Sequence, residues 1–403
     1  MAPPHRPLDR VHGRVAPGFE GVRQAFADNL ERREELGGAV ALWRKGEPLV
    51  DLWGGVADAA AGRPWTEDTI VLTYSVTKGM AAAGLAWLHD QGHLDYDAPV
   101  ATYWPAFADG GKDTITVRTL LGHQAGLFGI DARLTSDTLA DHDALADILA
   151  RQVPRHEPGA RHAYHALSLG FYQNELARRI DPEGRTLRGI VRDEIARPLG
   201  RRLSIGVPED LPTRRIAPVQ AINPWKLFLH PSELPPRFGL ALAWPWSWTA
   251  RSVRNPKLAG PADLDLPVWR TLELPSSNGY ATARGVAAMY DALLDPAGPL
   301  ALGDATRSAL TAPTALPPHG EADAVFHMRT AYHLGFMRPS SSFSFGSDAT
   351  AFGAPGVGGS FGFADPATGT GYAYVTNRLG FNVFDDAREQ ALRKACQEAL
   401  ARA

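Results

Sequence analysis

Apolar positions recur at helical spacing near the start of the chain and at strand spacing directly after it. Residues 18–36 carry apolar side chains three or four positions apart, at Phe19, Val22, Phe26 and Leu30. This spacing predicts an amphipathic helix. The next stretch, GGAVALWRKGEPLVDLWGGVAD, predicts two strands joined by a turn at Lys45-Gly46. We therefore expect a helix followed by a β-hairpin.

Strand patterns return only near the other end of the chain. The segments AYHLGFMRP, SFGFADP and TGYAYVTNRLG each predict a strand, and DDAREQALRKACQEALARA predicts a closing helix with an acidic start. Between the two ends, helical patterns dominate at 75–92, 137–151, 166–180 and 186–197, and TITVRTLLGHQAGL opens a further short helix. We therefore expect an α+β fold, in which an antiparallel sheet from both termini is flanked by helices and interrupted by a mostly helical insertion. The expected domains are 1–73 with 276–403, and 74–275.

Composition and charge narrow the function classes. The chain has 403 residues, of which 44% are hydrophobic, a net charge of −3 and one cysteine, Cys396. The near-balanced charge and the lack of a basic stripe argue against a nucleic-acid or anionic-membrane partner. No apolar run resembles a signal peptide or a membrane span, so we expect a cytoplasmic protein. The sequence sets no expectation for the oligomeric state.

The stretch TYSVTKGM places Ser75 three residues before Lys78, at the start of the helix predicted for 75–92. Residues three apart on a helix share one face. A lysine amine made neutral by burial can take the serine proton, which turns a weak nucleophile into a reactive one. The alternative is a serine N-cap followed by a surface lysine, because the four-residue pattern alone is weak evidence.

Other motifs make the Ser75 pattern more specific. The apolar strand TIVLTY, the Ser-x-x-Lys tetrad and the Ala-rich helix together resemble the serine β-lactamase and penicillin-binding-protein superfamily. Tyr164-His165-Ala166 resembles the Tyr-x-Asn element of class C β-lactamases and, more closely, the Tyr-His-Ala-Leu run of family VIII carboxylesterases. Val357-Gly358-Gly359 stands where β-lactamases have Lys-Thr-Gly. TITVRTLLGHQAGL and SSNGYATARGVAAMYDAL add further matches, and the resemblance implies a β-lactamase-like fold.

The resemblance implies a role for each matching residue. Ser75 would be the nucleophile, Lys78 the general base or proton relay, and Tyr164 the second member of that relay. The backbone N–H groups of Ser75 and Ser360 would form the oxyanion hole. Val357, Gly358, Gly359 and His165 are candidates for contact with the substrate. We expect no cofactor.

Two departures from the superfamily pattern favour an esterase. Val357 replaces the third-motif lysine, and Ala166 replaces the asparagine after the tyrosine. A charged bicyclic substrate would lose its main polar contacts, whereas a neutral ester would lose little. We expect a carboxylesterase acting on small to medium neutral esters, with weak or no β-lactamase activity. An acyltransferase or an amidase or peptidase using the same Ser-Lys-Tyr centre is the alternative, and a non-catalytic binding protein is the third hypothesis.

Two other patterns resemble known sites, an α/β-hydrolase elbow and a zinc-binding histidine pair, but each lacks a required residue. GGSFG at 358–362 fits the Gly-x-Ser-x-Gly elbow of α/β-hydrolases, but no histidine follows Ser360. His89 and His93 are four positions apart without the glutamate of His-Glu-x-x-His. We therefore expect neither an elbow serine nor a metal site.

Tryptophan and proline concentrate in residues 212–270. This segment holds five of the ten tryptophans, Trp225, Trp244, Trp246, Trp248 and Trp269. So many large rings are unusual for an exposed loop, and each could bury roughly 150–250 Å². We expect the segment to wall the substrate pocket, with Trp246 and Trp248 as the best candidates. Simple packing of the insertion onto the helices is the alternative.

Overall fold

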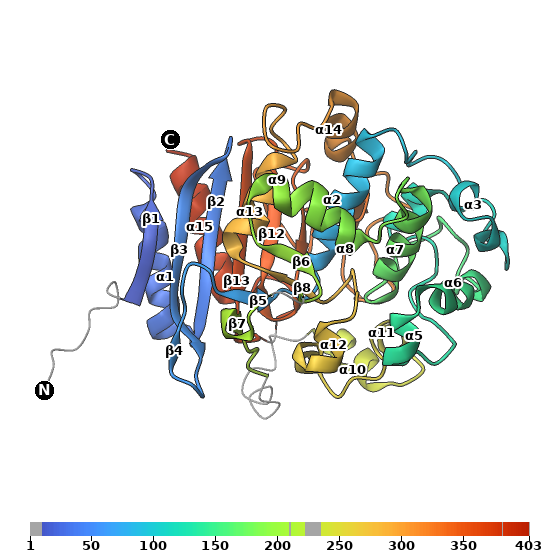
Figure 1. Ribbon diagram of the computed structural model, residues 1–403, viewed down its shortest axis with the longest axis horizontal. Helices are drawn as coiled ribbons and strands as arrows, with labels where there is room; N and C mark the ends of the chain where they lie inside the picture. The colour runs from blue at the N-terminus through green and yellow to red at the C-terminus, as the bar shows by residue number, and fades with distance from the viewer. Residues whose placement is uncertain (1–9, 209–210, 222–234, 381, 403) are drawn as a thin grey trace, which may run out of the picture.

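The computed structural model describes residues 10–208, 211–221, 235–380 and 382–402. Across these ranges a large antiparallel sheet carries helices on both faces (Figure 1). Its strands come from residues 11–64 and 331–376, and most helices lie between these two parts of the sequence. The predicted α+β architecture, with a sheet built from both chain ends, is confirmed. The proposed domain boundaries stay a prediction.

The large sheet joins the two ends of the chain at its centre. Within the described residues its strand order is β1-β3-β2-β13-β12-β11-β10-β9, with β4 beside β3, and all its pairs are antiparallel. The strands are β1 Val11–Val15, β2 Gly37–Arg44, β3 Glu47–Asp58, β4 Arg63–Pro64, β9 Ala331–His333, β10 Phe336–Arg338, β11 Phe352–Pro355, β12 Phe361–Asp365 and β13 Thr370–Thr376. Val40 of β2 lies opposite Tyr374 of β13.

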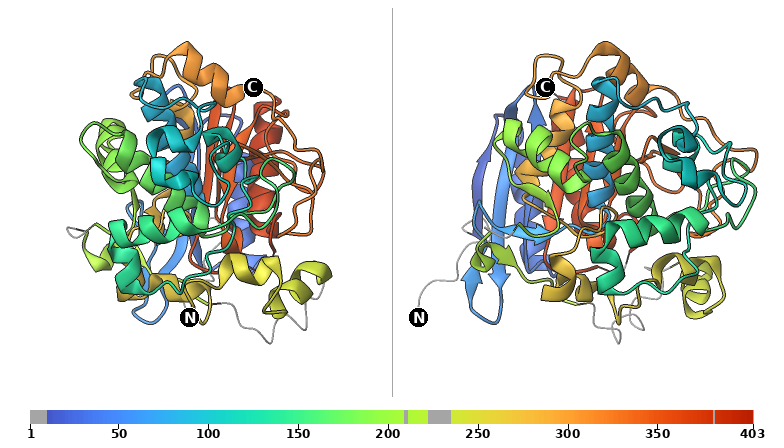
Figure 2. Two further views of the ribbon diagram at one scale, coloured as in Figure 1. Left: turned by 90° about the vertical axis from the view of Figure 1, so that its right-hand side faces the viewer. Right: turned by 45° about the vertical axis from the view of Figure 1, so that its right-hand side comes forward.

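Alternating side chains divide the core between the two faces of the sheet. Val40 and Leu42 of β2 pack in the cluster that includes α1 (Glu20–Arg32) and α15 (Ala387–Leu400). Ala41 and Trp43 belong to the cluster on the opposite face, with α2 (Val76–Asp90) and α13 (Ala283–Ala292). This is the two-residue periodicity of a strand that is covered on both sides. Figure 2 shows α2 and α13 against the sheet from two further directions.

Helix α2 lies deep in the helical part, and its small residues permit that position. A Cβ added at Gly79 would lie 2.1 Å from the Tyr290 hydroxyl of α13, and one at Gly84 would lie 3.1 Å from Leu187. The remaining helices are α3 Val100–Tyr103, α4 Val117–Leu121, α5 Ser136–Ala140, α6 His142–Arg151, α7 Ser168–Ile180, α8 Leu187–Ile190, α9 Arg197–Leu199, α10 Pro236–Ala243, α11 Trp248–Val253, α12 Pro267–Arg270 and α14 Asp304–Thr311. The Ala-rich sequence of α2 thus reflects close packing on several sides.

A second, four-stranded sheet of short strands lies within the described residues. Its order is β6-β8-β5-β7, formed by β5 Ile70–Leu72, β6 Leu203–Ile205, β7 Ile216–Ala217 and β8 Gly279–Ala281. The sequence pattern did not indicate these strands as a sheet, because each has only two or three residues. The sheet positions the start of α2, since β5 leads directly into it.

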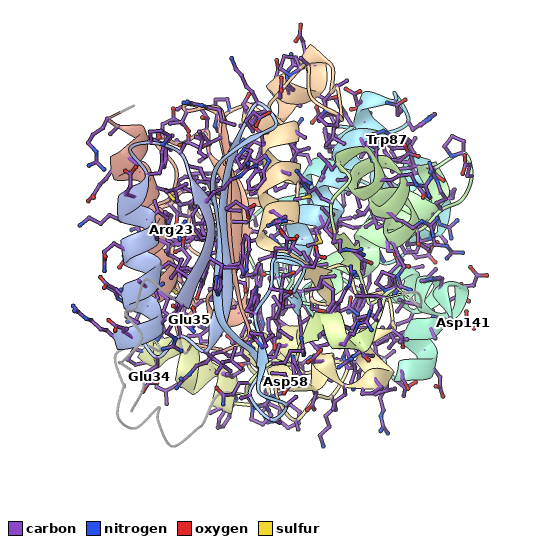
Figure 3. The ribbon with its side chains drawn as sticks, turned by 60° about the vertical axis from the view of Figure 1, so that its left-hand side comes forward. Arg23, Glu34, Glu35, Asp58, Trp87 and Asp141 are labelled. Carbon is purple, nitrogen blue, oxygen red and sulfur yellow. The ribbon has the colours of Figure 1, made fainter. Side chains whose placement is uncertain are left out.

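Predicted strands and helices are confirmed where the hydrophobic pattern is continuous. They are divided where a turn or a helix cap interrupts the chain. The turn at Lys45-Gly46 is confirmed, with φ of +52° and +78°. AYHLGFMRP is not one strand but the pair β9 and β10, because Leu334 and Gly335 have φ of +49° and +89°. The helix expected at 137–151 is two helices, and Asp141 between them (Figure 3) caps α6 by accepting the backbone N–H of Ala144 at 3.0 Å.

Among the described residues, no helix combines the length and the apolar character needed to cross a bilayer.

Candidate active site

Ser75 stands where β5 passes into α2. Tyr74, immediately before it, has φ of +52°, which turns the chain sharply out of the strand. The Thr73 N–H donates to the Gly279 carbonyl of β8 at 2.8 Å, and the Gly279 N–H donates to Thr77 Oγ1 at 2.6 Å. These bonds fix the first turn of α2 on both sides of Ser75, whose side chain stays half-buried.

The Lys78 amine lies one helical turn from Ser75 and faces three oxygen atoms. Its Nζ is 3.3 Å from Ser75 Oγ, and it donates to the carbonyls of Ala166 at 2.6 Å and Ser276 at 3.0 Å. Burial holds the pKa of Lys78 well below its usual value. A neutral amine has two N–H donors for the two carbonyls and one lone pair for the Ser75 hydroxyl, so the geometry suits a proton acceptor.

Tyr164 lies on the other side of the Lys78 amine. The Lys78 Nζ is 4.8 Å from the centre of the Tyr164 ring. Burial raises the pKa of the Tyr164 hydroxyl above its usual value, while a hydrogen bond with the Ser75 side chain lowers it less strongly. The structure therefore brings the three residues of the predicted Ser-Lys-Tyr centre together, although they come from α2 and from the segment before α7.

A small pocket opens onto this centre. It is lined by Ser75, Lys78, His123, Tyr164, Tyr332, Gly335, Met337, Ala354 and Pro355. The last five come from β9, β10, β11 and the turn between β9 and β10. Sequence reasoning did not find them, because they are distant from Ser75 in the chain.

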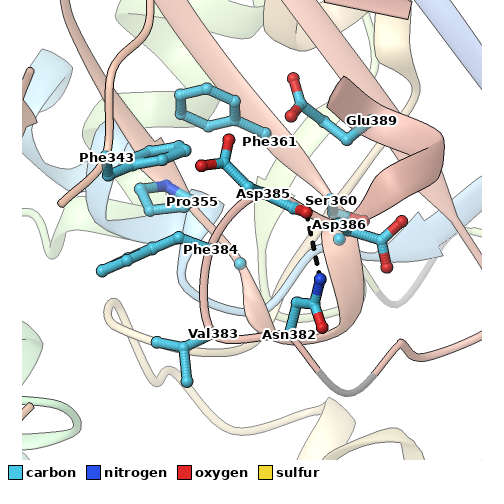
Figure 4. A pocket seen from close by; sticks show the side chains of 12 residues that line it. Phe343, Pro355, Ser360, Phe361, Asn382, Val383, Phe384, Asp385, Asp386 and Glu389 are labelled. Atoms are coloured by element: carbon cyan, nitrogen blue, oxygen red, sulfur yellow. Dashed lines mark hydrogen bonds between the residues drawn. The ribbon is translucent and has the colours of Figure 1, made fainter. Parts of the chain in front are cut away.

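The segment from Val357 to Ser360 lies beside this pocket and borders a second one. Ser360, Gly359 and Pro355 line the second pocket (Figure 4), and Pro355 belongs to both. The Ser360 hydroxyl oxygen accepts the Thr376 N–H at 3.3 Å, so this side chain is used within the fold. Among the hydrogen bonds of the described residues, none uses the backbone N–H of Ser75 or Ser360 as its donor. Both groups are therefore free to donate to a substrate oxygen, as the oxyanion prediction requires.

Val357 is 44% exposed at the start of this segment. Gly358 and Gly359 have φ of +86° and +111°, and a Cβ added at Gly359 would lie 2.9 Å from Asp386. The two glycines thus allow a backbone path that other residues would strain. Neither glycine presents a side chain to a substrate, so any contact they make uses the backbone.

His165 does not line the pocket around Ser75, contrary to the prediction. Its Nδ1 donates to the Ala163 carbonyl at 2.6 Å, and its Nε2 accepts the Leu127 N–H at 3.0 Å. Burial lowers the pKa of His165 to about 3, so the ring stays neutral and structural. His123 is the histidine that reaches the pocket, and its Nδ1 accepts the His165 N–H at 2.9 Å.

The tryptophan-rich segment differs from the expectation. Trp244 and Trp246 are 63% and 70% exposed, so the expected burial of these rings is wrong. Trp248 packs against Phe128 and His156, with ring centres 4.9 and 5.8 Å away. Neither Trp246 nor Trp248 lines the pocket at Ser75. Trp225 lies outside the described residues.

In the part of the chain that the structure describes, no group of three or more His, Cys, Asp or Glu side chains is arranged to hold a metal ion. His89 instead stacks on Tyr96, with ring centres 4.5 Å apart, and its Nδ1 lies 2.8 Å from the Thr306 hydroxyl.

Comparison with known proteins places this site in a family context. A family model described as Beta-lactamase matches residues 22–397. The esterase/beta-lactamase LipL of Mycobacterium tuberculosis is 36% identical over 377 residues, which cover 92% of this chain and 83% of that relative. The match is thus nearly complete for both proteins.

Two solved structures extend the similarity to three dimensions. A family VIII carboxylesterase superposes with a TM-score of 0.82 at 35% identity, covering 96% of this chain and 99% of that one. A penicillin-binding-protein homologue from Caulobacter crescentus superposes with a TM-score of 0.81 at 33% identity, with the same two shares.

Proposed function

This chain belongs to the β-lactamase family of serine hydrolases, and we propose that it is a carboxylesterase that forms an acyl-enzyme on Ser75. Its proposed substrates are small to medium neutral esters. The names of its relatives support the general class, since they include an esterase/beta-lactamase and a family VIII carboxylesterase. The choice of a neutral ester rests on the residues around Ser75.

The observation that carries this choice is the charge of the pocket. Among its described lining residues, Lys78 is the only lysine or arginine, and burial favours the neutral form of its amine. His123 is also neutral, because burial holds its pKa well below the usual value. No lining cation is therefore available for a substrate carboxylate. A β-lactam antibiotic carries that carboxylate, whereas a simple ester does not.

The geometry supports the following reaction. Ser75 Oγ attacks the ester carbonyl carbon while the hydroxyl proton passes to Lys78 Nζ. The N–H groups of Ser75 and Ser360 stabilise the negative charge that develops on the carbonyl oxygen. As the C–O bond to the alcohol breaks, the Lys78–Tyr164 relay returns the proton to the departing alkoxide. A water molecule then attacks the acyl-enzyme by the same steps and releases the acid and free Ser75.

A panel of p-nitrophenyl esters of rising acyl length, tested beside one chromogenic cephalosporin, examines this proposal. We expect turnover of short and medium esters and little or none of the cephalosporin, with Ser75→Ala as the inactive control. Efficient cephalosporin turnover with poor ester turnover would reject the esterase assignment. Adding an excess of alcohol or amine acceptor tests the alternative, because a transferase would form the transfer product faster than it hydrolyses the ester.

A further inference from the structure

Arg388, in the first turn of α15, reaches the backbone of the segment that precedes Ser360. Its Nη2 donates to the Gly358 carbonyl at 3.0 Å, and its Nη1 donates to the Arg378 carbonyl at 2.9 Å. The Gly380 N–H also donates to the Gly358 carbonyl, at 3.0 Å. Arg388 thus fastens this segment to the chain that follows β13.

The Arg388 guanidinium is held by two buried carboxylates. Asp386 accepts from its Nε and Nη2, both at 2.9 Å, and Glu35 lies 3.4 Å from its Nη1. The side chains of Arg388, Asp386 and Glu35 are 6%, 9% and 0% exposed. Glu35 also accepts hydrogen bonds from Tyr374 and Thr376 of β13. The guanidinium therefore has one defined position in the fold.

Such a cluster is poorly explained by stability alone. Burying ion pairs carries a large desolvation penalty, and apolar residues of similar volume often serve stability as well. A buried polar network does, however, fix geometry when all its members are bonded. The feature that this cluster fixes is the segment from Gly356 to Ser360.

That segment is held at several points around the Ser360 N–H. The Gly356 N–H donates to the Ser360 carbonyl at 2.7 Å, which closes the turn. The Thr376 N–H holds the Ser360 hydroxyl, and Asp386 fills the space beside Gly359. Arg388 Nη2 and the Gly380 N–H both donate to the Gly358 carbonyl, and Arg388 is the side chain that holds it. The direction of the peptide between Gly359 and Ser360 depends on these anchors together.

We propose that Arg388 is a positioning residue for the oxyanion hole: it holds the Gly358 carbonyl so that the Ser360 N–H points at the substrate oxygen. This inference rests on the proposed function, because it needs an acyl substrate on Ser75. Arg388 itself does not line the pocket at Ser75. Its effect reaches the reaction through the backbone of residues 358–360.

Arg393 provides a matched control on the same helix. It is 7% exposed and pairs with buried Glu389, whose Oε1 lies 3.0 Å from its Nε. It donates to the Ser344 carbonyl and makes no hydrogen bond to residues 356–360. Arg393 therefore shares the burial and the charge of Arg388 but not its contact with the turn.

The test compares Arg388→Lys with Arg393→Lys on p-nitrophenyl acetate and on the corresponding thionoacetate, in which sulfur replaces the carbonyl oxygen. Sulfur is a weak hydrogen-bond acceptor, so the oxygen-over-sulfur preference reports the alignment of the oxyanion hole. Removing one oxyanion donor typically lowers kcat by about 10²–10³-fold. For Arg388→Lys we expect a loss in kcat of about 10- to 100-fold, little change in KM and a reduced oxygen preference. Arg393→Lys should keep the wild-type preference even if its melting temperature falls.

An unchanged oxygen preference in Arg388→Lys, or equal changes in both variants, would overturn the proposal. If Arg388→Lys does not fold, Asp386→Asn tests the same point, since it retains shape while loosening the guanidinium. That variant should reduce the preference in the same direction, and an unchanged preference would count against the proposal. Absence of ester turnover in the wild type would instead reject the proposed function, and with it this inference.

Discussion

The amine of Lys78 lies 4.8 Å from the centre of the Tyr164 ring, within a site that excludes most water from both groups. An aromatic face attracts a cation, but burial opposes the charge. Burial is the dominant cause in both groups, lowering the pKa of Lys78 and raising that of Tyr164. Burial thus favours a neutral amine beside a neutral phenol.

The pH dependence of kcat/KM should follow from the lowered pKa of Lys78 and the raised pKa of Tyr164. We expect activity to rise with pH as Lys78 loses its proton, at a pH well below the usual lysine value. Activity should then stay level through mildly alkaline pH, because the pKa of Tyr164 is raised above its usual value of 10.0. A pH profile with p-nitrophenyl acetate measures this, after correction for spontaneous hydrolysis. A fall between pH 7 and 9 would mean that the active form of Lys78 is charged.

Ser75→Ala should remove essentially all acyl-enzyme formation, because the covalent intermediate needs its oxygen. Ser360→Ala should be mild, since only the backbone N–H of Ser360 is proposed to act and its hydroxyl merely accepts the Thr376 N–H. Mass spectrometry of the trapped acyl-enzyme, together with steady-state rates, distinguishes the two variants. If Ser360→Ala were as inactive as Ser75→Ala, the Gly-x-Ser-x-Gly pattern at 358–362 would have to be reconsidered.

Lys78→Ala and Tyr164→Phe should each lower kcat by about 10²–10⁴-fold, as expected when a positioned proton carrier is lost. The double variant should be little worse than the more damaged single variant, because the two side chains act as one unit. Single-turnover rates of the three variants measure the coupling. A double variant whose loss equals the product of the two single losses would contradict the relay.

Val357→Lys should improve the turnover of a cephalosporin that carries a free carboxylate. Val357 is 44% exposed at the edge of the site, so an added ammonium group would remain solvated and charged. An exposed ion pair contributes modestly, so we expect a gain in kcat/KM of about 2- to 5-fold. Val357→Met is the neutral control of similar length, and p-nitrophenyl acetate should respond to neither change. Equal gains for lysine and methionine would show that charge is not the cause.

Trp248 and Trp246 should differ in their effect on the preferred acyl length. Trp248 is packed against Phe128 and His156, whereas Trp246 is 70% exposed. If the packed ring supports the far end of an acyl chain, Trp248→Ala should change discrimination among esters by about 10-fold or more. Trp246→Ala should leave the dependence of turnover on acyl length unchanged from that of the wild type. If both variants kept the wild-type dependence on acyl length, and Trp248→Ala melted at a lower temperature, Trp248 would have a packing role only.

The parts of the site that the sequence predicted are those encoded by local pattern. Ser75 and Lys78 share a helical turn, and Tyr164 follows a recognisable motif. The carbonyl of Ser276 that orients the Lys78 amine had no such signal, because any residue supplies a backbone oxygen. Met337 and Ala354 reach the pocket only through strand pairing across the sheet, which sequence spacing does not reveal.

The fold was predictable for a similar reason. The strand patterns on either side of the Lys45-Gly46 turn identified β2 and β3, three- to four-residue spacing identified α1, and the acidic start identified α15. The short strands β5 to β8 have too few residues for periodicity, and pairing with one another defines them as a sheet. Tryptophan is usually buried, but Trp246 lies in the exposed turn between α10 and α11 and is 70% exposed.

The sheet contains strands from both ends of the sequence, so its two halves are synthesised at different times. The Asn29 amide donates to the Arg388 carbonyl, yet the two residues are 359 positions apart. At a translation rate of about 5–20 residues per second, β2 leaves the ribosome tens of seconds before β13 can pair with it. During that interval one edge of the hairpin has no partner, which exposes the nascent chain to aggregation. A competent catalyst must await the last strands, because Met337 and Ala354 of the pocket at Ser75 come from β10 and β11.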